Sequence, residues 1–196
     1  DVRAVMPVCV FGSAQPAEEW PAFHSKTGVP VVIDAAAAFG NQHDPGPTCA
    51  VYSMHATKPL SSGEGGFVAT RSQAMAEAIR QLSNFGINLT RPEVSAIGTS
   101  TMIGVNAKLS EYHAAVGHAS LDAWPENARR RRDLYTSYSG ALREACGDEA
   151  TWQDTDAQSV RSVCAFLMPS RVVRNRAETA LADAGVATRR WYCPTV

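Results

Sequence analysis

The first 34 residues alternate between apolar runs and a helical pattern, and this order constrains the fold more than any other feature. Residues 4–11 form a continuous apolar run that predicts a strand buried on both faces. Residues 17–27 predict a helix that Gly28 ends, and residues 29–33 predict a second buried strand that ends at Asp34. This order predicts an α/β fold with a mainly parallel central sheet flanked by helices.

Further elements follow along the chain. Residues 50–53 and 67–70 predict two more strands, and residues 84–105 are an irregular stretch rich in small and polar residues. The other predicted elements are helices over 72–83, 110–123 and 125–146, a polar linker over 147–159, a strand over 163–168, a helix over 175–184 and a strand over 186–192. We therefore predict a large domain over 1–123, a connecting helix over 124–148 and part of a small C-terminal α/β domain over 149–196.

The composition excludes several classes of protein. A net charge of -1 with 19% charged residues argues against a dedicated nucleic-acid surface, and we interpret Arg129 to Arg132 as a solvated helix face. No apolar run approaches the roughly 20 residues that span a membrane. The odd count of five cysteines without CxxC spacing argues against a disulfide framework and a zinc site. We expect a cytoplasmic protein, and a piece of a longer one because the chain opens without methionine.

Lys58 occupies the most distinctive loop of the chain. It follows the predicted strand at 50–53 and precedes a stretch rich in serine and glycine that leads into the strand at 67–70. Lysine amines form Schiff bases with carbonyl substrates and with pyridoxal phosphate (PLP). Taken alone, the loop fits an exposed lysine beside a glycine turn equally well.

Three other residues make a cofactor interpretation stronger. PLP chemistry needs a carboxylate beside the pyridine nitrogen, donors for the phosphate and a lysine for the aldehyde. Asp34 ends a buried strand, Ser53 lies five residues before Lys58, and Asn106 opens a separate segment. The alternatives are a helix N-cap for Asp34 and a turn residue for Asn106.

The ordered motifs resemble the PLP-dependent sugar aminotransferases of the DegT/DnrJ/StrS group, which have fold type I. The resemblance covers essentially the whole chain in the order of that family. It rests on Asp34-Ala35-Ala36, on Ser53 to Lys58, on Gly63-Glu64-Gly65-Gly66, on Asn106 to Glu111, on Met6 to Gly12 and on Arg189 to Pro194.

The resemblance implies a role for each matching residue. Lys58 is then the Schiff-base lysine and the catalytic base, and Asp34 pairs with the pyridinium nitrogen. Ala36 lines the cofactor beside Asp34, and Ser53 donates to the phosphate. Asn106 reaches the phosphate of the neighbouring subunit, which implies a homodimer with shared active sites. The matching motif also gives His55, near the lysine, a catalytic role, with a structural histidine as the alternative.

The activity implied is amination of a nucleotide-linked keto-sugar, with glutamate as the expected amino donor and pyridoxamine phosphate as the intermediate form of the cofactor. Surface-polysaccharide or antibiotic biosynthesis is the expected setting. The alternatives are a cyclitol aminotransferase, another PLP enzyme of fold type I, and a non-catalytic fragment that serves as a dimerisation or regulatory module. A large PLP-binding domain over residues 1–123 follows from the same resemblance.

Overall fold

The computed structural model describes residues 1–153, 156 and 158–191. The chain forms two compact units. The first comprises Asp1–Tyr135 together with Thr155–Val163, and the second comprises Thr136–Asp154 together with Cys164–Val196.

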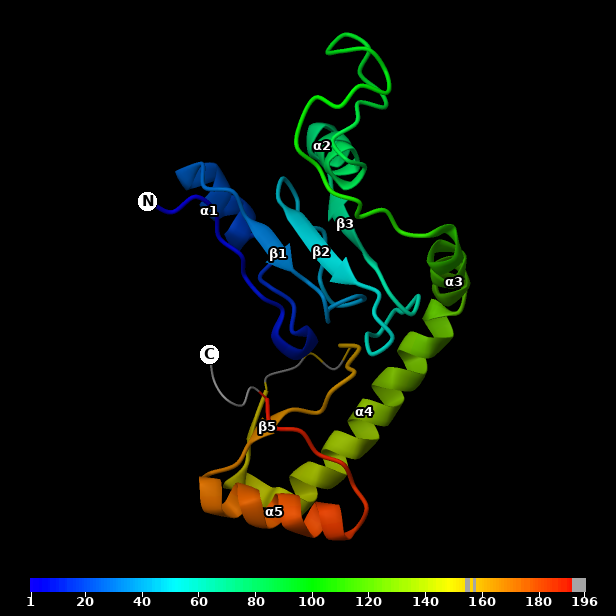
Figure 1. Ribbon diagram of the computed structural model, residues 1–196. Helices are drawn as coiled ribbons and strands as arrows, with labels where there is room; N and C mark the ends of the chain where they lie inside the picture. Colours follow the sequence, from blue (N-terminus) through cyan, green and yellow to red (C-terminus); the bar gives the residue numbers. More distant parts are fainter. Residues whose placement is uncertain (154–155, 157, 192–196) are drawn as a thin grey trace. The chain divides into compact units, whose positions relative to one another are not determined.

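A three-stranded mixed sheet organises the first unit. Its strands are β1 (Val32–Asp34), β2 (Cys49–Ser53) and β3 (Gly66–Thr70), and they lie side by side in that order (Figure 1). β1 and β2 are parallel, as predicted, whereas β3 pairs antiparallel with β2. The antiparallel pair arises because the segment between β2 and β3 folds back on itself as a long hairpin.

The strand predicted over residues 4–11 is wrong in its extent. Only isolated parallel bridges form there, from Val5 to Val31 and from Val8 to Asp34, and a 3-10 turn follows at Val10–Gly12. Half of the residues in this run are exposed, and the single buried one is Cys9. A physical reason is Pro7, which cannot donate a ladder hydrogen bond and confines the segment to the edge of the sheet.

Four helices belong wholly or partly to the first unit. They are α1 (Glu19–Thr27), α2 (Gln73–Ser83), α3 (Glu111–Asp122) and α4 (Trp124–Cys146), close to their predicted bounds. Gly28 ends α1 with φ 70°, as predicted. Ser72 caps α2 and Ser110 caps α3, each hydroxyl accepting a backbone hydrogen bond three residues on. None of the helices in the described ranges combines the length and apolarity that crossing a bilayer requires.

The second unit is smaller. It contains a 3-10 turn (Gly147–Glu149), the antiparallel pair β4 (Thr151–Trp152) and β5 (Phe166–Leu167), and α5 (Arg171–Asp183). α5 begins four residues earlier than predicted because the Ser170 hydroxyl accepts from Val173 N and caps it. The strand predicted over 186–192 is not formed by 186–191, and Tyr192 lies outside the described residues.

Apolar packing fixes β1 and β2 from within. A buried cluster comprises Cys9, Val31, Ile33, Ala35, Ala38, Ala50 and Tyr52. Tyr52 stacks on Phe67 with ring centroids 4.9 Å apart, and Phe39 packs edge-on against both rings. This packing holds the carboxyl ends of β1 and β2 at one edge of the sheet, where ligands bind in open α/β sheets.

Candidate functional site

Asp34 and Ser53 lie at the same edge of the sheet. Asp34 is the last residue of β1 and pairs with Val51 of the parallel strand β2, so Ser53 follows two residues beyond that pair. Asp34 N donates to Pro7 O (2.9 Å), and Asp34 O accepts from Cys9 N (2.8 Å). These two hydrogen bonds to Pro7 and Cys9 therefore fix the Asp34 backbone that carries the carboxylate.

The Asp34 carboxylate caps a turn rather than a helix. Its Oδ1 accepts from Ala36 N at 3.0 Å, and turns rather than a helix follow at 36–37 and 39–40. The helix N-cap alternative is thus excluded. The other carboxylate oxygen has no hydrogen-bond partner among the described residues, so it can accept a hydrogen bond from an N–H or O–H group of a ligand.

Ser53 keeps its hydroxyl hydrogen available. Its Oγ accepts from His55 N at 3.2 Å, and this bond uses only a lone pair. The hydroxyl can therefore donate to an oxyanion at the same edge as Asp34.

The segment that carries Lys58 is a hairpin with an ordered backbone. Met54 N donates to Gly65 O (2.8 Å), and Ala56 N donates to Gly63 O (2.8 Å). Lys58 N donates to His55 O (2.9 Å) at the tip. The Lys58 side chain is half-buried and forms no ion pair with any described residue. Its amine is thus left for a ligand close to the carboxyl end of β2.

Two glycines let this hairpin fit its surroundings. Gly65 has φ 110°, and a Cβ there would meet the Leu109 side chain that precedes α3. A Cβ on Gly66 would collide with Tyr52 O across the sheet. The close approach of β2, β3 and the segment before α3 therefore gives a steric reason for the last two glycines of the Gly-Glu-Gly-Gly sequence.

Helix α3 supports the hairpin from one side. Ser120 Oγ donates to Ser61 O (2.6 Å), and Gly117 leaves room for the buried Met54 side chain. Leu60 and Ser62 of the hairpin are 2% exposed. A lysine on this packed hairpin is held in a more defined position for catalysis than a lysine on an unsupported loop would be.

His55 lies on the same hairpin, with a structural role that the geometry defines. Its Nδ1 accepts from Thr57 N (3.2 Å), and its Nε2 faces Glu64 Oε1 at 3.7 Å. The side chain is 46% exposed. No hydrogen bond joins His55 to Lys58 through their side chains among the described residues, so its catalytic role stays a prediction.

Asn106 lies apart from the other predicted residues. It pairs with Asn84 in an isolated antiparallel bridge and is exposed. Neighbouring backbone groups bind the end of α2, with Val105 N donating to Leu82 O (2.8 Å) and Ala107 N to Ser83 O (2.9 Å). The structure thus brings Asp34, Ala36 and Ser53 to one edge with the Lys58 hairpin beside them, and does not bring Asn106 into hydrogen-bond contact with them.

A buried polar network behind Asp34 was not foreseen from the sequence. Gln42 Oε1 accepts from Gln15 N (2.8 Å) and from Cys9 Sγ (3.3 Å). Burial raises the pKa of the Cys9 thiol to about 11, and the Asp34 carboxylate adds to this rise. Cys9 is therefore a neutral hydrogen-bond donor rather than a nucleophile. Gln15 and Gln42 are 27 residues apart, so no periodic pattern in the sequence could have revealed the network.

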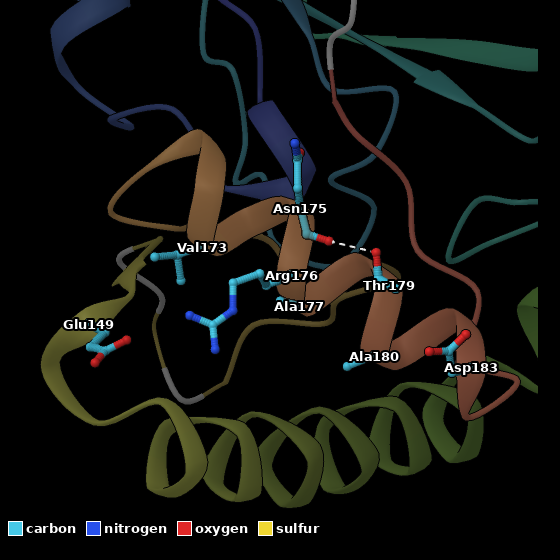
Figure 2. A pocket seen from close by; sticks show the side chains of 8 residues that line it. All are labelled: Glu149, Val173, Asn175, Arg176, Ala177, Thr179, Ala180 and Asp183. Carbon is cyan, nitrogen blue, oxygen red and sulfur yellow. Dashed lines mark hydrogen bonds between the residues drawn. The ribbon is translucent and has the colours of Figure 1, made fainter.

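A hollow in the second unit holds none of the predicted site residues. Figure 2 shows its lining, which consists of Glu149 and the α5 residues Val173, Asn175, Arg176, Ala177, Thr179, Ala180 and Asp183. The hydrogen bond drawn there, from Thr179 Oγ1 to Asn175 O (3.0 Å), lies within the helix. The described residues also contain no group of three or more His, Cys, Asp or Glu side chains placed to hold a metal ion.

Comparison with known proteins supports the resemblance along the whole chain. A family model described as the DegT/DnrJ/EryC1/StrS aminotransferase family matches residues 1–196. A dTDP-4-amino-4,6-dideoxy-D-glucose transaminase of Shigella dysenteriae is 29% identical over 203 residues, covering 100% of this chain and 53% of that protein. The match confirms the family expected from the sequence.

Solved structures confirm the fold. The structure of DesI in the presence of its TDP-sugar product has a TM-score of 0.73 and 31% identity, covering 97% of this chain and 49% of that one. A candidate PLP-dependent aminotransferase from Bacillus cereus ATCC 10987 has a TM-score of 0.81 and 28% identity, covering 98% and 52%. The α/β fold of fold type I predicted from the sequence is therefore correct.

The chain is shorter than these relatives. It spans 53% of the Shigella transaminase and 35% of a matching Mycobacterium tuberculosis protein, Rv3402c.

Proposed function

This chain belongs to the DegT/DnrJ/EryC1/StrS aminotransferase family, and on that premise we propose that it carries the lysine side of the active site of a PLP-dependent sugar aminotransferase. The substrate proposed is a nucleotide-linked keto-sugar, since DesI and the Shigella relative are named for nucleotide-sugar chemistry. The amino donor proposed is glutamate. The observation that carries the proposal is the placement of Asp34 and Ser53 at one edge of the sheet, with Lys58 on the packed hairpin that follows.

The residues present fit PLP on their chemistry. Asp34 has one carboxylate oxygen without a described partner, Ser53 has a hydroxyl hydrogen to donate, and Lys58 has an amine without an ion pair. PLP bound there would supply an electron sink for proton removal at the carbon that bears the nitrogen. Ala36 N–H donates to Asp34 Oδ1 only, so this hydrogen bond leaves the second carboxylate oxygen for the cofactor.

Each side chain then has a defined task. Asp34 would keep a pyridinium nitrogen protonated, because an anion beside it raises the pKa of that nitrogen. Ser53 would orient the phosphate end by a charge-assisted hydrogen bond. Lys58 would hold the cofactor through its Nζ, and the same amine would move the proton. The hydrogen bonds of the hairpin fix the backbone that carries Lys58.

A second copy of the chain is part of the proposal. Many apolar side chains from the end of α2 to the first turn of α3 are exposed, among them Phe85, Leu89, Val94, Ile97, Met102, Ile103, Val105, Leu109 and Tyr112. A run of this kind is typical of an interface. The proposed homodimer covers these residues, and Asn106 of one subunit reaches the phosphate at the site of the other.

Subunit mixing tests the shared site. Lys58→Ala and Asn106→Ala proteins are inactive alone, and a heterodimer of the two has one site with both wild-type residues. Random exchange of equal amounts should recover about a quarter of wild-type activity in a symmetric dimer. Recovery of no activity, with exchange proved by mass, would overturn the shared-site arrangement.

The activity itself is tested on the full-length protein loaded with PLP. Glutamate should convert the cofactor to pyridoxamine phosphate, and a panel of nucleotide-linked keto-sugars should restore the starting absorbance. Lys58→Ala should lose both half-reactions, whereas Lys26→Ala, an exposed control on α1, should keep them. A folded, PLP-loaded wild-type protein that reacts with cyclitol ketones and not with nucleotide-linked sugars would refute the substrate class.

A further inference from the structure

His55 joins the two residues that are proposed to bind different ends of the cofactor. Its backbone N donates to Ser53 Oγ (3.2 Å), and its backbone O accepts from Lys58 N (2.9 Å). Its side chain lies in the same turn, where Nδ1 accepts from Thr57 N (3.2 Å). One residue therefore makes hydrogen bonds to Ser53, to Lys58 and to the residue directly before Lys58.

The bond from Thr57 N defines which ring nitrogen of His55 carries the proton. A backbone amide can only donate, so Nδ1 presents its lone pair, and the proton of the neutral ring is on Nε2. Thr57 Oγ1 is 2.9 Å from the same Nδ1 and is a second donor to it. Nε2 faces Glu64 Oε1 at 3.7 Å, and a carboxylate there favours this tautomer because it attracts the N–H.

The Nδ1 bond holds the turn from which the Lys58 side chain departs. Ala56 N donates to Gly63 O (2.8 Å), so the residue before Thr57 is already fixed to the other side of the hairpin. Thr57 N has no acceptor other than Nδ1 among the described residues. Because Thr57 is exposed, water can replace this bond when it is lost, and the hairpin should still fold. The loss should therefore affect the position of the lysine more than the stability of the protein.

The geometry of the ring favours positioning over proton transfer. A residue that moves a proton in the reaction needs a ring nitrogen within hydrogen-bond reach of the reacting atoms. Nδ1 accepts from Thr57, and Nε2 faces Glu64, so both nitrogens are directed at the hairpin itself. Neither nitrogen makes a hydrogen bond to the Lys58 amine within the described part of the chain.

We propose that His55 is a positioning residue, which fixes the backbone of Thr57 and thereby the direction from which the Lys58 amine enters the cofactor site. Glu64 assists by keeping the proton on Nε2. This role rests on the proposed function, in which Lys58 binds the cofactor. Asparagine should substitute for His55, because its side-chain oxygen accepts from the amide two residues on, as in an Asx turn.

Two substitutions in the full-length protein loaded with PLP separate positioning from proton transfer. His55→Ala should lower kcat for transamination about tenfold and change KM less than about twofold, since misplacement of a reacting group slows the chemical step. His55→Asn should recover most of that loss. His118→Ala, at an exposed histidine of α3, is the matched control and should keep the wild-type kcat.

Amide hydrogen exchange of the PLP-free full-length protein measures the same bond without any activity. Exchange at Thr57 should be faster in His55→Ala than in the wild type, and His55→Asn should restore the protection. Glu64→Ala should have a smaller effect in the same direction. It should add little in the double variant with His55→Ala, because both changes act through Nδ1.

Specific results would overturn this role. If His55→Asn is as slow as His55→Ala, the reaction needs the imidazole itself rather than an acceptor for Thr57 N. Wild-type kcat and wild-type exchange in His55→Ala would show that the Nδ1 bond positions nothing. If the cofactor is found on a lysine other than Lys58, the proposed function fails, and the exchange at Thr57 still decides whether His55 holds this turn.

Discussion

Asn41 offers the sharpest test of how the candidate site is supported. Its amide is 8% exposed and satisfies three backbone groups, namely Gly12 O, Val160 O and Val160 N, at 2.7–2.8 Å. Asn41→Ala leaves all three buried groups unpaired. At about 1 kcal/mol for each lost partner, the free energy of unfolding should fall by about 3 kcal/mol.

Urea unfolding of the full-length protein, followed by circular dichroism, measures this change. With a slope of about 2–3 kcal/mol/M, the midpoint should fall by about 1 M or more. Asn41→Asp should be at least as destabilising, because a carboxylate oxygen would then face two carbonyl oxygens. Asn127→Ala is the matched control, since Asn127 is exposed on α4 and should change stability little. A loss below about 1 kcal/mol for Asn41→Ala would refute the view that this amide joins the two segments.

Three other changes probe the site and its frame by denaturation. Gly66→Ala should destabilise by about 2 kcal/mol or more, because the new Cβ collides with Tyr52 O; a wild-type midpoint would contradict that steric argument. Ser72→Ala should cost about 1 kcal/mol through loss of the bond from Met75 N (3.2 Å), and an unchanged midpoint would mean that the cap contributes nothing. The Cys9 pKa is raised from 9.0 to about 11, so the unfolded state releases its proton first and stability should fall as pH rises from about 9 to 11, by about 2–3 kcal/mol. Cys9→Ala should flatten that decline, and a decline equal to that of the wild type would show that the thiol is not its source.

Local patterns predicted much of the fold. The helix ended by Gly28 and the strand ended by Asp34 follow from apolar spacing and a left-handed cap, both of which are local properties. The strand predicted over 4–11 was wrong in its extent because apolar content alone does not distinguish a paired strand from an edge segment interrupted by Pro7. The strand over 67–70 was predicted without its direction, since only the folded connection from β2 decides that β3 runs antiparallel.

The candidate site was predictable only in part. Asp34 and Ser53 end strands that are parallel neighbours, so their meeting at one edge follows from strand order. The hydrogen bonds from Asn41 to Val160 and from Arg161 to Phe11 join residues 119 and 150 positions apart, and no short-range pattern encodes them. The exposed position of Asn106 likewise depends on how residues 84–109 fold back on the end of α2.

Identification of the residue that carries the cofactor tests the central claim most directly. The full-length protein is incubated with PLP, reduced with borohydride, digested and analysed by mass spectrometry. The residues printed here include three lysines, at 26, 58 and 108, which serve as internal comparisons. The account predicts stoichiometric pyridoxyl labelling of Lys58 that disappears in Lys58→Ala and persists in Lys26→Ala. Stoichiometric labelling of any other lysine, with Lys58 unmodified in the folded protein, would contradict it.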